Sequence, residues 1–142
     1  MRALAICGSP RRAGNTEALL QRCLERMAAR GVAGELVRLA DLTVAPCTGC
    51  GVCRERPGEG CVITDDDFAF IFEAMLRADI ILVGSPVYFG SATPNLMALL
   101  DRAGYVARGR GNAFSRKLGG PVVVARRAGH NFTYAQLLLW FM

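Results

Sequence analysis

The sequence predicts an α/β fold, a three-layer sandwich in which a central parallel sheet is covered by helices on both faces. Short apolar runs alternate along the whole chain with longer segments whose apolar residues recur at helical spacing. The apolar runs lack the alternation of a half-exposed strand, so they are expected to be buried on both faces, as parallel strands are. Residues 1–142, of which 52% are hydrophobic, are therefore expected to form a single domain.

Four apolar runs are predicted as the strands of this sheet. Each run is bounded by glycine, proline or charged residues, which favour turns. The runs occupy residues 3–7, 34–39, 79–84 and 120–125. Because the carboxyl ends of parallel strands meet at one edge, the loops that follow them are expected to share a crevice.

Helical spacing predicts a first helix closed by Gly31, and a second helix that opens at residues 64–67, a threonine followed by three aspartates. Carboxylates at that position favour the positive end of the helix dipole. Between the second strand and this helix, residues 46–63 show neither a helical nor a strand period. They are predicted to form a cysteine-rich loop.

Two more helices are predicted in the second half of the chain. Thr93 is expected to be the N-cap of the first and Pro94 its initial residue, with Gly104 at its end. Residues 105–117 are then expected to form a polar, basic loop. Thr133 is expected to begin the last helix.

The last residues, 134–142, are apolar and carry no helix stop signal. A further strand and helix are therefore expected beyond this point, or a partner that covers the surface. The net charge of +5 comes almost entirely from scattered arginines, with no basic amphipathic helix or aromatic stripe, which argues against a nucleic-acid partner. Without a spanning segment or secretion signal, a cytoplasmic protein with no membrane partner is expected.

The loop GSPRRAGNT, residues 8–16, joins the first strand to the first helix. Such a turn directs unpaired backbone N–H groups and the positive end of the helix dipole at one point, which suits a phosphate. It is neither a Walker A loop nor a dinucleotide fingerprint. The alternative is an ordinary turn capped by Asn15 or Thr16.

Two further loops are expected at the same crevice. SPVYFG, residues 85–90, follows the third strand and offers two aromatic rings between a proline and a glycine. ARRAGH, residues 125–130, follows the fourth strand and contains the only histidine, His130. The sequence is equally consistent with two roles for His130, a solvated loop residue and a proton donor.

Four cysteines, Cys47, Cys50, Cys53 and Cys61, follow the spacing C-x2-C-x2-C-x7-C. The first three are so close that their thiolates can converge only on a compact group, as at the start of a bacterial ferredoxin run. The group that these four cysteines are first predicted to bind is therefore a [4Fe–4S] cluster. Loop thiols without a metal are the main alternative, followed by zinc or disulfides, which the spacing and a reducing compartment disfavour.

In order and spacing, GSPRRAGNT, SPVYFG and RRAGH resemble the FMN-binding loops of the NAD(P)H-dependent FMN reductases of flavodoxin-like fold. The cysteine segment resembles their iron–sulfur flavoprotein branch. The resemblance covers the whole chain and implies a five-stranded sheet, of which four strands are found. It also implies that one group of residues holds the FMN phosphate and another lines the isoalloxazine ring. The phosphate group is Ser9, Arg11, Asn15 and Thr16, and the ring group is Pro86, Val87, Tyr88, Phe89 and Gly90, with Arg127 and Gly129 beside it.

The resulting prediction is an FMN-dependent oxidoreductase that takes electrons from NAD(P)H or ferredoxin and relays them through a [4Fe–4S] cluster. No side chain stands out as an acid, base or nucleophile, so no catalytic residue is predicted. The alternatives are a cluster-free FMN or quinone reductase and a non-catalytic, flavin-binding redox sensor. Arginines at 105–117 or 126–127 are candidate contacts for a nucleotide phosphate or an acidic ferredoxin. The apolar C-terminal surface and the cysteine loop favour a homodimer or homotetramer.

Overall fold

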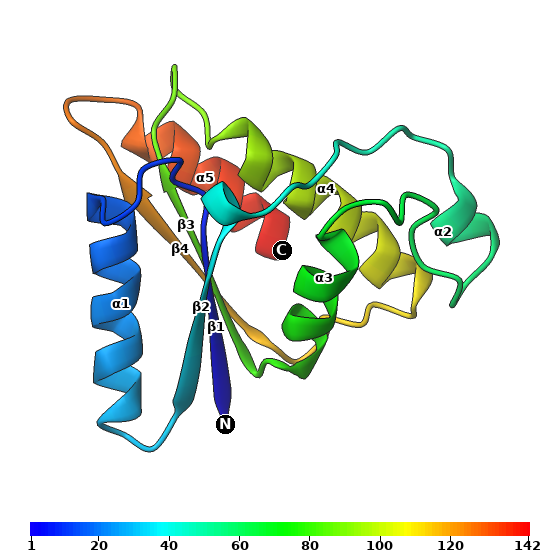
Figure 1. The fold of residues 1–142 in the computed structure, drawn as a ribbon, viewed down its shortest axis with the longest axis horizontal. Coiled ribbons are helices and arrows are strands. Elements are labelled where there is room, and N and C mark those ends of the chain that lie inside the picture. The colour runs from blue at the N-terminus through cyan, green and yellow to red at the C-terminus, as the bar shows by residue number, and fades with distance from the viewer.

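The computed structural model describes residues 1–142 and contains four parallel strands in the order β2-β1-β3-β4 (Figure 1). The predicted fold class is confirmed, and each predicted strand is found to within two residues at either end. The chain order reverses beside β1, where β2 lies on one side and β3 on the other. The strands are β1 (Arg2–Cys7), β2 (Ala33–Arg38), β3 (Ile80–Pro86) and β4 (Leu118–Val124).

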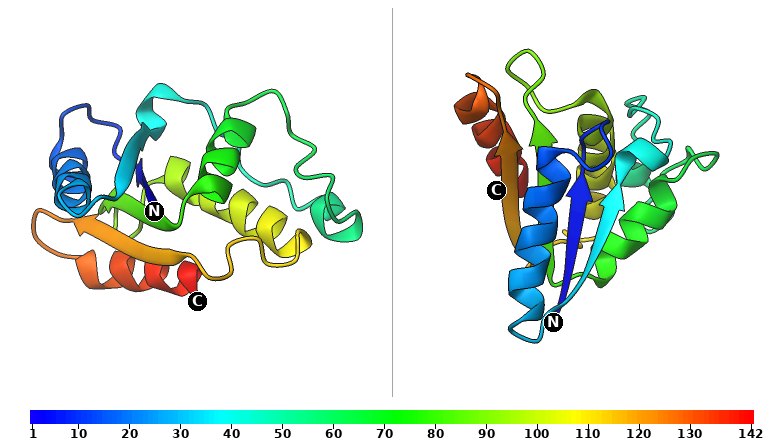
Figure 2. Two further views of the ribbon diagram at one scale, coloured as in Figure 1. Left: turned by 90° about the horizontal axis from the view of Figure 1, so that it is seen from below. Right: turned by 60° about the vertical axis from the view of Figure 1, so that its left-hand side comes forward.

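Helices cover both faces of the sheet, but unequally (Figure 2). One face carries α1 (Asn15–Ala28), and the other carries α3 (Phe68–Arg77), α4 (Pro94–Gly109) and α5 (His130–Phe141). Two short elements follow β2, namely η1 (Leu39–Asp41) and α2 (Val52–Glu55). None of the helices combines the length and apolar character that crossing a membrane requires.

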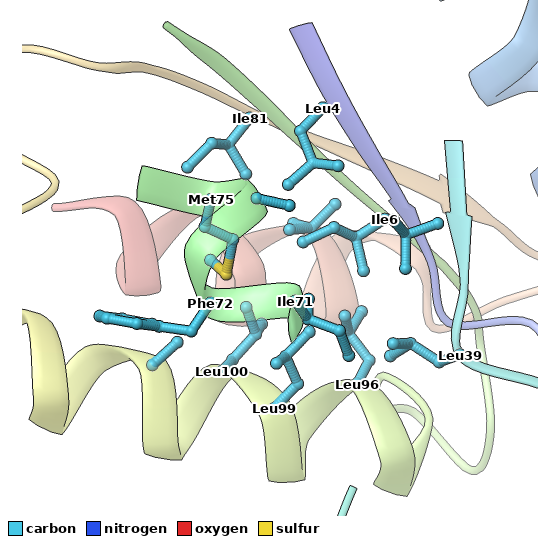
Figure 3. Packing of buried hydrophobic residues seen from close by; sticks show 14 of the residues in the cluster. Leu4, Ile6, Leu39, Ile71, Phe72, Met75, Ile81, Leu96, Leu99 and Leu100 are labelled. Atoms are coloured by element: carbon cyan, nitrogen blue, oxygen red, sulfur yellow. The ribbon is translucent and has the colours of Figure 1, made fainter. Parts of the chain in front are cut away.

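The central strand β1 contributes side chains to the core on both faces of the sheet. Leu4 and Ile6 point into the cluster formed with α3, α4 and α5, while Ala5 and Cys7 pack against α1. The first cluster contains 20 buried residues and the second only 4, so most of the burial that stabilises the fold lies on the three-helix face. Figure 3 shows side chains of the larger cluster between the sheet and α4.

The predicted end of α4 at Gly104 is wrong, because the helix continues to Gly109. Gly104 has a packing role instead: a Cβ atom there would lie 3.3 Å from Nε1 of Trp140 on α5. The same indole N–H donates a hydrogen bond of 2.8 Å to the carbonyl oxygen of Leu100. Gly104 therefore allows two helices to pack closely, instead of ending a helix as a glycine often does.

Two other predicted boundaries also change. The last helix begins at His130 rather than Thr133, because Gly129 takes the N-cap position and leaves Thr133 buried one turn into the helix. The cysteine-rich loop 46–63 is interrupted by the single turn α2, which a glycine in the left-handed region precedes. Both changes place glycines with positive φ at helix starts, where sequence rules favour Ser, Thr, Asp or Asn.

Lys117, the only lysine, closes the C-terminal end of α3. Its Nζ donates hydrogen bonds of 2.8 Å and 2.6 Å to the carbonyl oxygens of Leu76 and Ala78. We expect Lys117→Met to lower the free energy of unfolding by about 1–2 kcal/mol, because it removes two charge-assisted hydrogen bonds. Urea unfolding followed by circular dichroism measures this, with Arg116→Met as the exposed neighbouring control. Equal midpoints for the two variants would contradict the capping role.

Candidate functional site

The loops after β1 and β3 are joined at Gly8. The Gly8 N–H donates a hydrogen bond of 2.7 Å to the carbonyl oxygen of Gly84, and the Thr93 hydroxyl donates one of 2.7 Å to the carbonyl oxygen of Gly8. A Cβ atom at position 8 would lie 2.8 Å from Thr93 Oγ1 and 2.9 Å from Leu96 Cβ. Only glycine allows this approach, so the first two predicted loops start from one point on the sheet.

The first predicted loop ends at a helix start that no side chain caps. Gly14 occupies the N-cap position of α1, so the prediction that Asn15 or Thr16 caps the turn is wrong. Ser9 and Thr16 are buried in this loop, while Arg11 and Asn15 are exposed. The Ser9 hydroxyl oxygen accepts a hydrogen bond of 3.2 Å from the Arg11 N–H, which curls the loop over the helix end.

A buried carboxylate supports this loop from below. Glu17, in the first turn of α1, accepts a hydrogen bond of 2.8 Å from the Ala13 N–H and pairs with Arg38 at 3.2 Å. Arg38 also pairs with Asp41, which in turn pairs with Arg12 at 2.6 Å. The hydrogen bond from Arg38 holds the pKa of Asp41 below its usual value. The loop is therefore tied to the end of β2 by a chain of ion pairs.

The second predicted loop forms a tight turn at the tip of the sheet edge. Tyr88 and Ser91 exchange backbone hydrogen bonds of 2.9 Å and 3.0 Å, and the two residues between them both have positive φ. Phe89, at φ 51°, is fully exposed, and Tyr88 is partly exposed. The turn thus presents aromatic surface to the solvent beside Pro86 and Val87.

The third predicted loop reaches the second one through Gly129. Its φ of 87° requires the left-handed region, and a Cβ atom there would lie 2.8 Å from Val87 Cγ1 and 3.3 Å from the Cα of Gly90. Arg127 and His130 on either side are exposed. The structure therefore brings the three loops to one edge of the sheet, as Figure 1 shows.

The four cysteines of the loop between η1 and α3 line one pocket of about 140 Å³, together with Arg102, Tyr105 and Val106 of α4. All four are free thiols, with Cys47 and Cys50 exposed and Cys53 and Cys61 partly buried. Burial raises the pKa of the Cys53 thiol, and the nearby sulfurs of the other three raise it further. Four soft sulfur donors line one space, and no three of them converge on a single ion position. This arrangement suits a cluster, in which each thiolate binds a different iron, better than a single metal ion.

Sequence reasoning missed the ion pair beneath this pocket. Arg102 and Asp66 form a salt bridge, and their side chains are 0% and 3% exposed. Burial by itself would lower the pKa of Arg102, but the hydrogen bonds to Asp66 and the influence of the neighbouring Cys61 thiol raise it above its usual value. A signal was present: Arg102 lies at helical spacing among Leu96, Leu99 and Val106, on the apolar face of α4.

Solved flavin reductases share this fold. An NADH:FMN oxidoreductase superposes with a TM-score of 0.69 at 23% identity, covering 96% of this chain and 65% of its own. The NAD(P)H:quinone oxidoreductase from Methanothermobacter marburgensis superposes with a TM-score of 0.73 at 16% identity, covering 92% and 67%. The architecture is thus that of the flavodoxin-like flavoreductases.

Comparison of amino-acid sequences identifies relatives within this class of flavoreductases. An iron–sulfur flavoprotein of Methanocaldococcus jannaschii is 38% identical over 144 residues, which cover 100% of this chain and 72% of the relative. One from Methanosarcina thermophila is 37% identical over 142 residues, covering 99% and 72%. The model of the NADPH-dependent FMN reductase family matches residues 1–142, and the chain belongs to this family of FMN-dependent oxidoreductases.

Proposed function

We propose that this protein is an FMN-dependent oxidoreductase that receives electrons from NAD(P)H or ferredoxin and passes them on through a [4Fe–4S] cluster. The main support is the junction at Gly8, which ties the beginning of the loop that leads to the uncapped start of α1 to the end of β3, from which the aromatic turn follows. A phosphate suits the helix start, and a flat ring suits the turn. One mononucleotide matches both.

We assign the ligand contacts residue by residue. The phosphate is held by backbone N–H groups at the start of α1 and by neutral hydroxyl and amide donors, with one guanidinium adding charge. The ring lies against the loop after β3 and the rim formed by the loop after β4. The phosphate residues are Ser9, Arg11, Asn15 and Thr16, and the ring residues are Pro86, Val87, Tyr88, Phe89, Gly90, Arg127 and Gly129.

Bound FMN would supply hydride and single-electron chemistry, and the chain would supply orientation and electrostatics. Cys47, Cys50, Cys53 and Cys61 would hold the cluster, since all four line one pocket. The residues of α4 that line this pocket belong to its second half, against which α2 packs. The aromatic turn lies beyond the other end of α4 (Figure 1). We therefore propose a homodimer or homotetramer in which the flavin of one copy approaches the cysteine pocket of another, which sedimentation of the loaded protein would test.

The proposal also covers the electron donor and the cellular compartment. Exposed arginines near the ring, Arg126 and Arg127, are the candidate contacts for a nicotinamide nucleotide phosphate or an acidic ferredoxin. A reducing cytoplasm would keep the four thiols available for a cluster.

The decisive experiment is metal and flavin analysis of protein purified without oxygen. We expect bound FMN, about four irons per chain, and absorbance that bleaches rapidly when NADPH or reduced ferredoxin is added. Flavin without iron would remove the cluster from the proposal. A colourless protein that takes up no added FMN would remove the whole assignment.

A cluster-free FMN or quinone reductase is the second candidate. It is favoured by the match of residues 1–142 to the NADPH-dependent FMN reductase family, whose description names FMN and no cluster. The same analysis separates the two, because the cluster-free enzyme would bleach with NADPH and contain no iron. A flavin-binding redox sensor, the remaining alternative, would bind FMN but show no rapid bleaching.

A further inference from the structure

Arg102 is fully buried beneath the cysteine pocket. It comes from α4, which also packs against α2 of the cysteine loop (Figure 1). Its guanidinium carbon lies 4.1 Å from the centre of the Phe68 ring, which fixes the plane of the group. A charged side chain is rarely buried to this degree without a specific set of partners.

The guanidinium ties together the two ends of the cysteine loop. Nη1 donates a hydrogen bond of 3.1 Å to the carbonyl oxygen of Ala45, and Nη2 donates one of 2.9 Å to that of Ile63. Ala45 stands two residues before the first cysteine of the loop, and Ile63 stands two residues after the last. One side chain therefore closes the segment that carries all four thiols.

The donors of Arg102 can be counted completely. A guanidinium has five N–H groups, and the two on each terminal nitrogen are used by Asp66 together with the carbonyl oxygens of Ala45 and Ile63. The fifth, on Nε, is buried without a partner. A buried donor without an acceptor is unfavourable, so this position calls for an acceptor that the protein itself does not provide.

We propose that Arg102 is a positioning residue for the iron–sulfur cluster: it closes the cysteine loop and offers its remaining N–H and its positive charge to the sulfur atoms in the pocket. The inference rests on the proposed cluster. Hydrogen bonds and positive charge beside the sulfurs favour the reduced cluster, because reduction adds negative charge there. Arg102 should therefore slow the loss of iron and raise the reduction potential.

The test compares Arg102→Met with Arg108→Met in protein reconstituted without oxygen. Arg108 lies on the same helix and is exposed, so its variant controls for the loss of one positive charge. We expect Arg102→Met to release iron to a chelator about 10–100-fold faster than the wild type. Its retained cluster should show a more negative midpoint potential, while the Arg108 variant matches the wild type in both.

Arg102→Lys covers the case in which the methionine variant does not fold. Lysine keeps the charge beside Asp66 but lacks the Nε–H and cannot bridge both carbonyl oxygens. We expect it, too, to lose iron faster than the Arg108 control. If every folded Arg102 variant matches that control in iron release and reduction potential, the positioning role of Arg102 is refuted, while the proposed cluster stands. If wild-type protein takes up no iron, the proposed cluster fails and takes the inference with it.

Discussion

Replacing Asp66 with asparagine is expected to lower the free energy of unfolding by about 3–5 kcal/mol, the cost of leaving a buried charge without its partner. Asparagine keeps the shape of the side chain, so the loss reports the missing charge and the hydrogen bonds that an NH2 group cannot accept, rather than a cavity. Asp65→Asn is the matched control, because Asp65 is exposed and adjacent. Urea unfolding of both variants measures the difference. If Asp66→Asn lowers the free energy of unfolding no more than Asp65→Asn does, the ion pair does not contribute to stability.

The stability carried by Asp66 should also depend on pH. Burial by itself would raise the pKa of Asp66, but the hydrogen bond from Arg102 and those from two backbone N–H groups lower it below its usual value. A carboxyl whose pKa is lower in the folded state adds stability above its unfolded pKa of about 3.9. This contribution is lost as the pH falls through the folded value. The gap between wild type and Asp66→Asn should therefore be full at neutral pH and narrow below about pH 4.

Gly8→Ala is expected to have the largest effect on flavin binding. The added Cβ atom would lie 2.8 Å from Thr93 Oγ1 and 3.1 Å from the carbonyl oxygen of Gly84, so the two loops must separate. Overpacking of this kind disfavours the native arrangement by about 1–3 kcal/mol. If FMN needs both loops in place, its affinity falls at least about tenfold.

Gly14→Ala provides the control for this variant. It lies in the same loop and changes the same atom, but the nearest neighbour of its Cβ would be 3.3 Å away. FMN binding to both variants can be measured by the quenching of flavin fluorescence. Full affinity in Gly8→Ala would show that the junction does not shape the site.

The sheet and the order of its loops were accessible from the sequence because buried parallel strands are continuous apolar runs. The helix ends were less accessible. Gly104 has the sequence signature of a helix stop, yet it lies inside α4 because Trp140 needs the space above it. That requirement comes from a residue 36 positions away, which no local pattern reports. The start of α5 at His130 was missed for a related reason, since Gly129 is selected there by its contact with Val87.

The candidate site was predictable in part. The loops could be placed together because strand ends meet at one edge of a parallel sheet. The acidic residues 65–67 were interpreted as favouring the start of a helix, and Asp66 does accept a hydrogen bond of 3.1 Å from the Phe68 N–H. Its second role, facing Arg102, depends on how α4 packs beneath the cysteine loop. The contact joins residues 36 positions apart and could not be derived from spacing.

The hydrogen bonds that hold Gly8 between Gly84 and Thr93 have a consequence for how a ligand would associate. Because both halves of the crevice are already joined at this residue, a mononucleotide arriving there need not order one half after the other. The entropic penalty of arranging the crevice is met during folding, before any encounter takes place. Association should then be limited by orientation and diffusion rather than by a slow closure.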